Sequence, residues 1–392
     1  MTRGRRSAAI LLLAGGLFAT AGVTAAVPGA STASPDSADA SWRHAAPGHD
    51  WSFPRDHHAH PAFRTEWWYV TGLLRPADGA PVRLAFQWTL FRVGLLPATP
   101  PLASAWRCRD LVLGHLAVTD PVAGRHLFRE VLWRGTPLLA GTPPPPDPLL
   151  AWCVAPAGTD GRWSLALAPG DTFRLRAADA GSGLALDLAL VPLTPPVLQG
   201  DGGFSAKNRD GDRGSLYYSL PRLATAGTVV LDGDTLRLTG TSWLDREFTS
   251  DPLAGDLAGW DWFGLRLRDG RALTLYVLRD AAGRAAVTSS TLAGPDGRTV
   301  RLTPGDGFLT VTDHWTSPRT GARYPSRWRL RLPAAGLDLV VTPLLPDQEN
   351  VGTRSGVVYW EGAVSLHDPA GRPAGEGYVE LTGYGAGRLP FP

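Results

Sequence analysis

Alternation of apolar and polar residues is the feature that most constrains what this 392-residue chain can fold into. In the segment 83–90 the even-numbered residues are large and apolar, whereas residues 83, 87 and 89 are polar. A period of two sends successive side chains to opposite faces of a β-strand. The apolar face of this predicted strand carries Leu84, Phe86, Trp88 and Leu90. Because no segment after residue 45 has the period of an amphipathic helix, the sequence predicts an all-β fold.

Asp-Gly pairs separate many of the alternating segments. Asp232-Gly233 and Asp269-Gly270 each lie between two short apolar runs, and further pairs begin at positions 78, 160, 201, 210, 296 and 306. Such pairs supply the positive φ angles that tight hairpin turns require. We therefore expect short antiparallel strands joined by hairpins.

The length of the chain favours two domains over one. The segment 217–223 ends one block of sequence, and a new series of predicted hairpins begins at Gly227. We therefore predict one β-barrel or sandwich over residues 46–225 and a second over residues 226–392. Each has enough predicted strands to enclose a ligand.

The first 26 residues have the three parts of an export signal. Arg3, Arg5 and Arg6 form a basic start, residues 8–18 an apolar stretch, and residues 24–26 a small-residue exit. The apolar stretch is too short for a comfortable membrane span, and Arg5-Arg6 leaves a twin-arginine route open. Residues 27–45 are predicted to be a flexible lead-in. The sequence thus predicts a secreted or periplasmic protein with no stable membrane span after removal of the signal.

Cys108 and Cys153 are the two cysteines of the chain. In an exported protein an even pair usually forms a disulfide, which in a loop of this length stabilises the fold by a few kcal/mol. The sequence therefore predicts a Cys108–Cys153 disulfide, with two buried free thiols as the alternative.

The charge of the chain is balanced. Without the three arginines of residues 1–6, 35 basic residues face 36 acidic ones, and the basic residues are scattered along the sequence. This distribution implies no electrostatic partner, and we expect no binding to nucleic acid. The sequence has no phosphate-binding loop and no paired Cys-x-x-Cys motif, so no cofactor is predicted. Nothing in it specifies an oligomeric state.

Fifteen tryptophans against one methionine make the composition unusual, and several of them lie beside acids. These segments are 65–69, 243–248, 260–263 and 359–361. Aromatic rings form large apolar walls and present negative π-faces to a cation. A carboxyl group among such walls is desolvated, so its pKa rises and it can donate a proton. The pattern predicts an apolar pocket that contains a few acidic side chains, and hence a small apolar ligand.

These segments, with several others, resemble a known protein family. The matching stretches are Phe53 to Pro61, Phe63 to Gly72, Leu198 to Lys207, Tyr217 to Leu223, Trp243 to Phe248, Gly259 to Phe263, Tyr359 to Gly362 and Gly377 to Tyr384. Together they span nearly the whole predicted mature chain. They resemble the AttH and carotenoid 1,2-hydratase-like proteins, which have two lipocalin-like domains and are often described as secreted hydrolases.

The resemblance implies a range of activities. Members of this family hydrate carotenoid end groups or guide the cyclisation of polyketide-like chains, and their ligand lies between or within the two β domains. In the hydratases a His and a Trp follow an Asp in the segment that matches 243–248. Here Asp245 is kept, but Arg246 and Phe248 occupy the other two positions. This departure argues against strict carotenoid hydration.

Hydration of an isolated alkene requires protonation of carbon and passes through a carbocation. Such a reaction needs an acidic carboxyl, a water-poor cavity and aromatic faces beside the cation. Asp245 and Asp261 are the predicted acids because each lies beside Trp or Phe, and Glu66 is a third candidate. The predicted ligand-binding residues are Trp68, Trp243, Phe248, Trp260, Trp262, Tyr217, Tyr218, His115 and Trp360.

Structural roles compete with these assignments. Asp245, Arg246 and Glu247 could form a buried network that ties strands together. Glu66 and Trp68 share one face of a predicted strand, opposite to the face of residues 67 and 69. Glu66 can therefore join only Trp68 in a pocket wall, and it could equally serve the fold.

The histidines have ordinary interpretations as well. His57 and His60 lack the spaced third partner of a zinc motif, so no metal site is predicted. We expect one of them to order a loop, with Asp56 bonded to one ring. His115 lies on a predicted strand and could face the cavity, although a buried histidine with its hydrogen bonds satisfied is the default.

The sequence therefore favours an exported protein of two lipocalin-like domains that binds an isoprenoid, lipid or polyketide-like molecule. Acid-catalysed hydration or cyclisation of an alkene is the predicted chemistry. A non-catalytic lipid carrier is one alternative. A secreted hydrolase is another, for which the sequence offers only Ser205 and Lys207, two residues apart in a Gly-rich loop.

Overall fold

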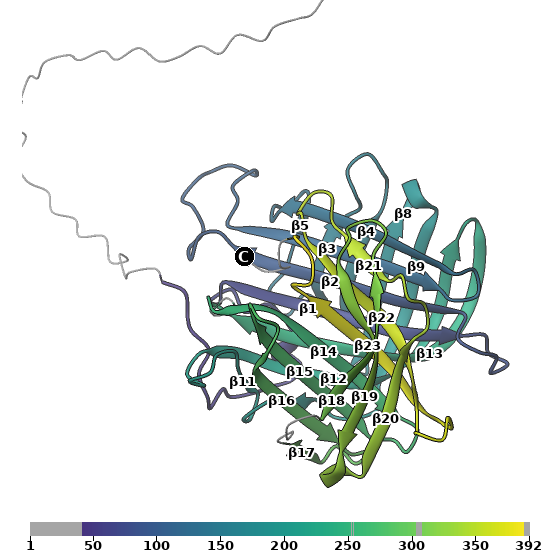
Figure 1. The fold of residues 1–392 in the computed structure, drawn as a ribbon. Coiled ribbons are helices and arrows are strands. Elements are labelled where there is room, and N and C mark those ends of the chain that lie inside the picture. The colour runs from purple at the N-terminus through teal and green to yellow at the C-terminus, as the bar shows by residue number, and fades with distance from the viewer. Residues whose placement is uncertain (1–40, 252, 254, 303–307, 388–392) are drawn as a thin grey trace, which may run out of the picture. The chain divides into compact units, whose positions relative to one another are not determined.

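Two large antiparallel β-sheets make up the computed structural model of this chain, which describes residues 41–251, 253, 255–302 and 308–387 (Figure 1). Within these ranges there is no α-helix. The short 3-10 turns are η1 (Arg55–His57), η2 (Ala180–Ser182) and η3 (Pro333–Ala335). The predicted all-β class with two lipocalin-like domains is confirmed. The predicted signal, residues 1–26, and most of the lead-in, residues 27–45, lie outside the described residues. No helix among the described residues is long and apolar enough to cross a membrane.

The first sheet has 13 strands. In spatial order its main path is β4 (Arg125–Arg134), β3 (Asp110–Asp120), β2 (Leu84–Gly94), β1 (Thr65–Arg75), β13 (Asp234–Thr249), β12 (Gly214–Leu231), β9 (Leu184–Pro192), β8 (Thr172–Asp179), β7 (Arg162–Ala168), β6 (Leu149–Val154) and β5 (Ala140–Gly141). The short strands β10 (Val197–Leu198) and β11 (Phe204–Ala206) also pair with β12.

The second sheet has 10 strands and is drawn in green to yellow in Figure 1. Its main path is β17 (Thr299–Leu302), β16 (Ala285–Ala293), β15 (Ala272–Asp280), β14 (Leu257–Leu267), β23 (Pro373–Thr382), β22 (Val358–His367), β20 (Leu337–Pro343), β19 (Arg323–Leu332) and β18 (Leu309–Thr316). The short strand β21 (Glu349–Val351) pairs with β22.

The first sheet curls so that its two ends face each other. The indole Nε1 of Trp133 on β4 donates to the carbonyl of Val154 on β6 at 3.0 Å. A Cβ atom on Gly114 of β3 would lie 3.2 Å from the ring of Trp163 on β7. The core inside this curl contains the even-numbered face predicted for 83–90, namely Leu84, Phe86, Trp88 and Leu90. That face assignment is confirmed.

Strand β1 is buried on both faces, because the two sheets pack on each other there. Trp68 and Val70 point into the core of the first sheet. Tyr69 and Leu73 point the other way and pack in a third cluster with residues of the second sheet such as Trp262. Successive residues of one strand therefore serve two interiors.

The Asp-Gly turns form as predicted where the structure describes them. Leu231 pairs with Asp234 across the β12–β13 hairpin, and Asp232 and Gly233 take φ angles of 54° and 89°. Two positive φ angles are what a two-residue turn of type I′ requires.

The structure changes from the first sheet to the second between Thr249, the end of β13, and Leu257, the start of β14. Residue 225, where we predicted the domain boundary, lies inside β12, and the hairpin that follows it remains in the first sheet. The two sheets belong to one compact unit.

The predicted disulfide is wrong, since both cysteines are free thiols. Cys153 lies on β6 with its side chain in the core of the first sheet. Cys108 lies before β3, and its Sγ atom is 3.0 Å from the carbonyl oxygen of Asp110. Burial raises the pKa of the Cys153 thiol, which keeps it in its unreactive form.

We predict that a thiol reagent in excess labels Cys108 in the folded protein and labels Cys153 only after unfolding. Half-buried Cys108 can be reached from solvent, whereas Cys153 is 0% exposed. Intact mass spectrometry of labelled protein, with and without denaturant, checks this. If the denatured protein takes up label only after it has been reduced, Cys108 and Cys153 do form a disulfide.

Candidate functional site

A cavity lies between the facing surfaces of the two sheets. Its walls come from β1, β2, β12 and β13 of the first sheet and from β14, β15, β22 and β23 of the second. Its volume is about 130 Å³, close to that of cavities that hold one benzene-sized molecule, and it is not fully enclosed, so a longer ligand can extend beyond it. A ligand that binds here would contact both sheets at once.

Aromatic rings dominate the walls of this cavity. They are Trp67, Tyr69, Phe91, Tyr217, Trp260, Trp262, Tyr276 and Tyr359. Trp262 meets Tyr69 and Trp243 edge to face, with ring centroids 5.4 Å and 5.8 Å apart. A Cβ atom on Gly264 would lie 2.3 Å from the Trp262 ring, so the glycine leaves room for this indole. The predicted apolar, aromatic pocket therefore exists, and Trp260, Trp262 and Tyr217 line it as expected.

Asp245 is a buried acid in the cavity wall. Its Oδ1 atom accepts hydrogen bonds from Ser219 Oγ at 2.5 Å and Trp243 Nε1 at 2.7 Å, and its Oδ2 atom accepts one from Tyr217 OH at 2.9 Å. No ion pair of Asp245 is found among the described residues. The carboxyl is therefore held by neutral donors alone.

Two opposing effects set the charge of Asp245. Burial disfavours the carboxylate and the three donors favour it, and the balance raises its pKa to about 7. The donors are themselves fixed, because Tyr217 accepts from Trp262 Nε1 and Ser219 accepts from Gln199 Nε2. Asp245 can thus take up or release a proton near neutral pH without rearranging its neighbours.

Two further carboxyl groups lie in the wall formed by the second sheet. Glu361 on β22 and Glu380 on β23 are directly opposite each other in the sheet, and both line the cavity. Burial, followed by the charge of Glu380, raises the pKa of Glu361 well above its ordinary value. Burial likewise raises the pKa of Glu380 to about 8. Because two adjacent buried carboxylates cannot both ionise, the pair keeps a proton at neutral pH.

Glu247, unlike these acids, has a basic partner. Lys207 Nζ lies 2.9 Å from Glu247 Oε1 and 4.4 Å from the ring centroid of Tyr276. Burial disfavours the charge on Lys207, but Glu247 outweighs it, so the pKa of Lys207 is raised. A lysine that holds its proton cannot activate Ser205, whose hydroxyl is bonded to Tyr276 OH at 2.7 Å. This geometry argues against a Ser-Lys hydrolase.

Asp261 lies on the face of β14 that points away from the cavity. It accepts a hydrogen bond from Arg279 Nε at 2.9 Å and from Tyr384 OH at 2.9 Å. Alternation along the strand sends Trp260 and Trp262 to the cavity and Asp261 to the opposite side. Of the two predicted acids, the structure therefore places only Asp245 in the cavity.

Glu66 also lies outside the cavity, at the centre of a buried ion cluster. It is fully buried and pairs with Arg92 and with Arg246, the latter at 2.6 Å. Burial opposes the charge on Glu66, but the two guanidinium groups outweigh it and hold the pKa of Glu66 well below its ordinary value. The expected network of three consecutive residues is not formed, because Arg246 points to the opposite face of β13 from Asp245 and Glu247.

The strand face predicted for the pocket is the wrong one on β1. Glu66 and Trp68 do share a face, but that face belongs to the interior of the first sheet, and Arg246 lies 3.8 Å over the Trp68 ring. Trp67 and Tyr69, on the opposite face of the strand, line the cavity instead.

Several other predicted ligand contacts are core residues. Tyr218 and Trp360 lie in the cores of the first and second sheets, and Trp243 lies behind Trp262. Phe248 stacks on His60 with ring centroids 3.7 Å apart. None of these four side chains is among the residues that line the cavity.

His115 stands one layer behind the cavity. Its Nδ1 atom lies 2.8 Å from the hydroxyl of Tyr359, a cavity residue, and its Nε2 atom has no hydrogen-bond partner within the described ranges. Burial lowers the pKa of His115 to about 4, so the ring is neutral at neutral pH. His115 therefore positions Tyr359 rather than a ligand.

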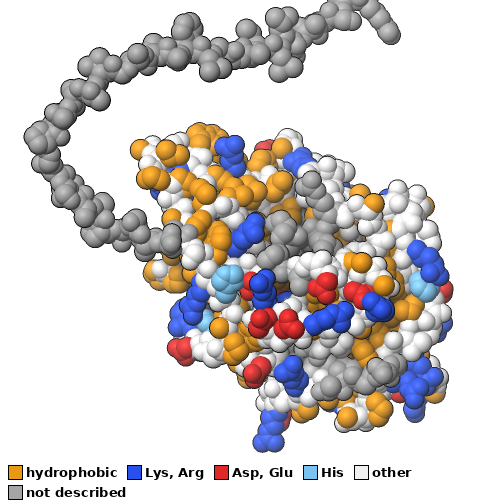
Figure 2. All heavy atoms as spheres, turned by 60° about the vertical axis from the view of Figure 1, so that its left-hand side comes forward, with side chains coloured by type: hydrophobic (Ala, Val, Ile, Leu, Met, Phe, Trp, Pro, Cys, Tyr) orange, Lys and Arg blue, Asp and Glu red, His pale blue; other side chains and the backbone are white. Residues whose placement is uncertain are grey.

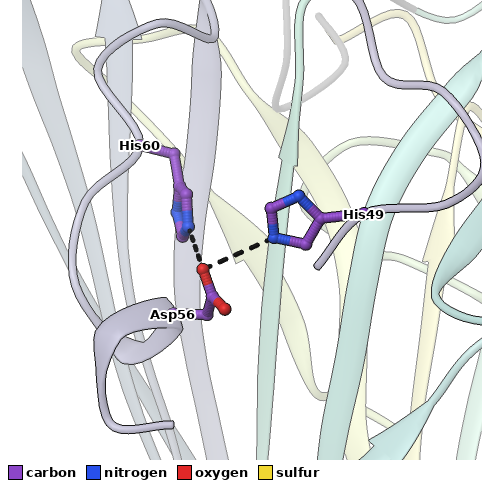
Figure 3. Close-up of side chains that lie close together, drawn as sticks. All are labelled: His49, Asp56 and His60. Carbon is purple, nitrogen blue, oxygen red and sulfur yellow. Dashed lines mark hydrogen bonds and ion pairs between the residues drawn. The ribbon is translucent and has the colours of Figure 1, made fainter. Parts of the chain in front are cut away.

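His49, Asp56 and His60 meet near η1 (Figure 3). Asp56 Oδ1 lies 3.0 Å from His60 Nε2 and 3.4 Å from His49 Nε2, as expected for an Asp56 bonded to one ring. Two imidazoles and a carboxylate are ligands that suit a transition metal. Here, however, Arg55 also binds the carboxylate at 2.9 Å, and such a cation would oppose a metal ion. These groups satisfy one another and order the loop, and His57 does so too through Tyr218 OH at 2.6 Å.

Charges of both signs mix on the surface. Figure 2 shows basic and acidic side chains interspersed across one face of the molecule. That face has no continuous basic stripe of the kind that follows a phosphate backbone.

The fold and the sequence are similar to those of known proteins. The family model for AttH-like proteins matches residues 44–384. The chain belongs to the AttH-like family. An AttH-type protein from Nitrosomonas europaea has a similar structure with a TM-score of 0.71 and 33% identity, over 86% of this chain and 98% of that one. No curated protein matches the sequence.

A second similar structure is the kievitone hydratase from Nectria haematococca. It has a TM-score of 0.59 and 16% identity to this AttH-like chain, and the match covers 84% of this chain and 91% of the other. At this identity the likeness shows a shared fold.

Glu361 and Glu380 were not among the acids predicted from the sequence for this site. Glu361 belongs to a noted Trp-acid segment and Glu380 to one of the family-like stretches, but the two are 19 positions apart. Only the pairing of β22 with β23 brings them together. Alternation within each strand was the available signal, since it places Tyr359 and Glu361 on the same face of one strand and Tyr378 and Glu380 on the same face of the other.

We predict that Glu380→Gln reduces the pH dependence of stability. The pKa of Glu380 rises from 4.5 to about 8 on folding, so between these values unfolding releases a proton. The free energy of unfolding should therefore fall as the pH rises, by up to ~1.4 kcal/mol per pH unit. Denaturant unfolding of wild type and variant between these pH values measures the slope.

Asp338→Asn is the matched control for this measurement. Asp338 is exposed, and its bond with Arg329 lowers its pKa, so its titration ends below this pH range. The control should keep the wild-type slope. A Glu380→Gln protein with the same slope as wild type would show that Glu380 does not take up a proton on folding.

Proposed function

We propose that this protein binds a small apolar, alkene-containing molecule in the cavity and adds water to it, or closes a ring in it, by acid–base catalysis. The observation that carries this proposal is the set of three carboxyls in an aromatic cavity, Asp245, Glu361 and Glu380, with no basic partner among the described residues. An apolar wall selects the ligand, and acids with raised pKa values can deliver protons to it.

The two walls would play different parts. The Glu361–Glu380 pair holds a proton at neutral pH, so it is the proposed proton donor. Asp245 faces it from the first sheet and is bound by three donors that favour its charged form. Asp245 is therefore the proposed base and the proposed counter-charge for a cation.

A balanced hydration follows from these roles. Glu380 would transfer its proton to one alkene carbon, and the carbocation formed on the other carbon would lie against the ring faces of residues such as Trp262. Water would add to that carbon while its proton passes to Asp245. Return of this proton to Glu380 through solvent would restore both groups. In a cyclisation, a second double bond would attack the carbocation in place of water.

The fold shared with kievitone hydratase is compatible with this chemistry, and the residues that line the cavity of this chain support it. As the N-terminal segment predicts, we place the activity outside the cytoplasm. The chemistry proposed for the cavity does not depend on the compartment.

We predict that Trp67→Ala weakens binding of a neutral apolar fluorophore, N-phenyl-1-naphthylamine, by about tenfold. Trp67 lines the cavity, and loss of its ring removes contact area on the order of 1–2 kcal/mol. Trp152→Ala is the control, because Trp152 on β6 is also half-buried but packs against Arg162 of β7, away from the cavity. Fluorescence titration gives both dissociation constants. Equal constants for the two variants would place the probe elsewhere.

We predict that Asp245→Asn and Glu380→Gln each lower turnover about 100-fold or more while probe binding persists. The assay follows a short isoprenoid alkene such as geraniol in water enriched in heavy oxygen, with mass spectrometry of the product. Asp261→Asn is the matched control, since Asp261 is a buried acid outside the cavity. It should keep turnover wherever it folds, as judged by circular dichroism.

Binding without any product from a panel of isoprenoid and polyketide-like alkenes would indicate a carrier instead. Full turnover in both cavity variants would exclude the proposed acids.

A further inference from the structure

A second cleft lies between the same two sheets, at the end of the strands away from the aromatic cavity. Its volume is about 400 Å³. The polar residues that line it are Arg75 of β1, Arg222 of β12, Thr241 of β13, Arg266 and Arg268 at the end of β14, and Glu376 of β23. We call it the arginine cleft.

The charges of the arginine cleft do not balance. Its lining contains four arginines and one carboxylate. Arg75 forms an ion pair with Glu376, which leaves three guanidinium groups in excess. Asp269 lies near Arg222, but its carboxylate is bound to Arg271 at 2.7 Å.

Arg266 is the residue that points to a ligand. Its side chain is only 3% exposed, yet none of its three nitrogens has a hydrogen-bond partner among the described residues. The Glu376 carboxylate is 3.7 Å away, within reach of an ion pair but beyond a hydrogen bond. A buried guanidinium with unmet donors is costly, and native proteins rarely leave such a group without an ion, a ligand or water.

The fold forces Arg266 into this position. Arg266 pairs with Glu376 across β14 and β23, and alternation sends it to the same face as Trp262, toward the first sheet. Burial lowers the pKa of Arg266 to about 10, which still leaves it charged at neutral pH. The positive charge is therefore permanent and confined between the sheets.

Arg222 forms part of a second wall of the cleft. Its Nε and one terminal nitrogen donate to the carbonyl groups of Gly270, Leu267 and Arg271 at 3.0, 2.6 and 3.1 Å. These bonds hold the guanidinium plane rigid while its charge stays uncompensated. A preorganised guanidinium is suited to binding oxyanions through paired hydrogen bonds.

We infer that the arginine cleft binds a doubly charged, phosphate-type oxyanion, with Arg266 as its central ligand and Arg222 and Arg268 beside it. A dianion neutralises two of the three excess positive charges and can satisfy the donors of Arg266. This site is separate from the aromatic cavity and does not depend on the function proposed for it.

The test is isothermal titration calorimetry of the full chain with inorganic phosphate, in sodium chloride of matched ionic strength. Phosphate should bind, and acetate, a monoanion, should bind more weakly. Arg266→Met should weaken phosphate binding about tenfold or more, the loss expected for a charged hydrogen-bond donor. Arg268→Gln, a change at an exposed residue, should weaken it to a smaller degree without risk to folding.

Arg298→Gln is the control, because Arg298 is 90% exposed and lies outside the cleft. It should bind phosphate as wild type does. Absence of phosphate binding to wild type, tighter binding of acetate, or unchanged binding in both Arg266→Met and Arg268→Gln would each overturn the proposal. Arg266→Met replaces the guanidinium with an apolar side chain. An Arg266→Met protein that is more stable than wild type and no longer binds phosphate would support the proposal.

Discussion

Burial of both faces of the same strands is the constraint on which the rest of this structure depends. Strands β1 and β13 complete the core of the curled first sheet with one face and meet the second sheet with the other. Every second residue must therefore suit a different interior. On β1 this separates Trp68, which closes a core, from Trp67, which lines a cavity. A shift of one residue in register would exchange the two sets.

Because both faces of these strands are buried, an unpaired charge on them costs free energy. The buried acids of the chain are accommodated in two ways. Glu66 is neutralised by Arg92 and Arg246, so its pKa stays low and it acts as a structural tie. Removal of one partner from such a cluster typically costs about 3–5 kcal/mol. Glu380 has no arginine partner in the part of the chain that the structure describes, and its pKa rises to about 8. The absence of a guanidinium distinguishes an acid available for chemistry from one that holds the fold.

Much of the fold could be predicted from alternation and Asp-Gly turns, because both are local. The face of Leu84, Phe86, Trp88 and Leu90 and the turn at Asp232 belong to this class. The disulfide could not be settled, since cysteine spacing does not reveal that Cys153 points into a core.

The site, too, could be predicted from the sequence only in part. Asp245 was recognised from its aromatic neighbours, and it lies in the cavity. Asp261 has equally aromatic neighbours but points to the opposite face of its strand. Sequence neighbours on a strand are not spatial neighbours, so proximity to Trp cannot tell the two apart. Which face meets the other sheet depends on strand pairing, and the Glu361–Glu380 pair was missed for that reason.

Lys207, the single lysine of the chain, stands in the cavity wall with its ammonium group against Glu247. The same ammonium group lies 4.4 Å from the ring centroid of Tyr276, another residue of the cavity wall. The side chain of Lys207 is thus the one side-chain primary amine of the molecule. An amine-directed reagent that modifies a side chain therefore reports on how accessible the aromatic cavity is.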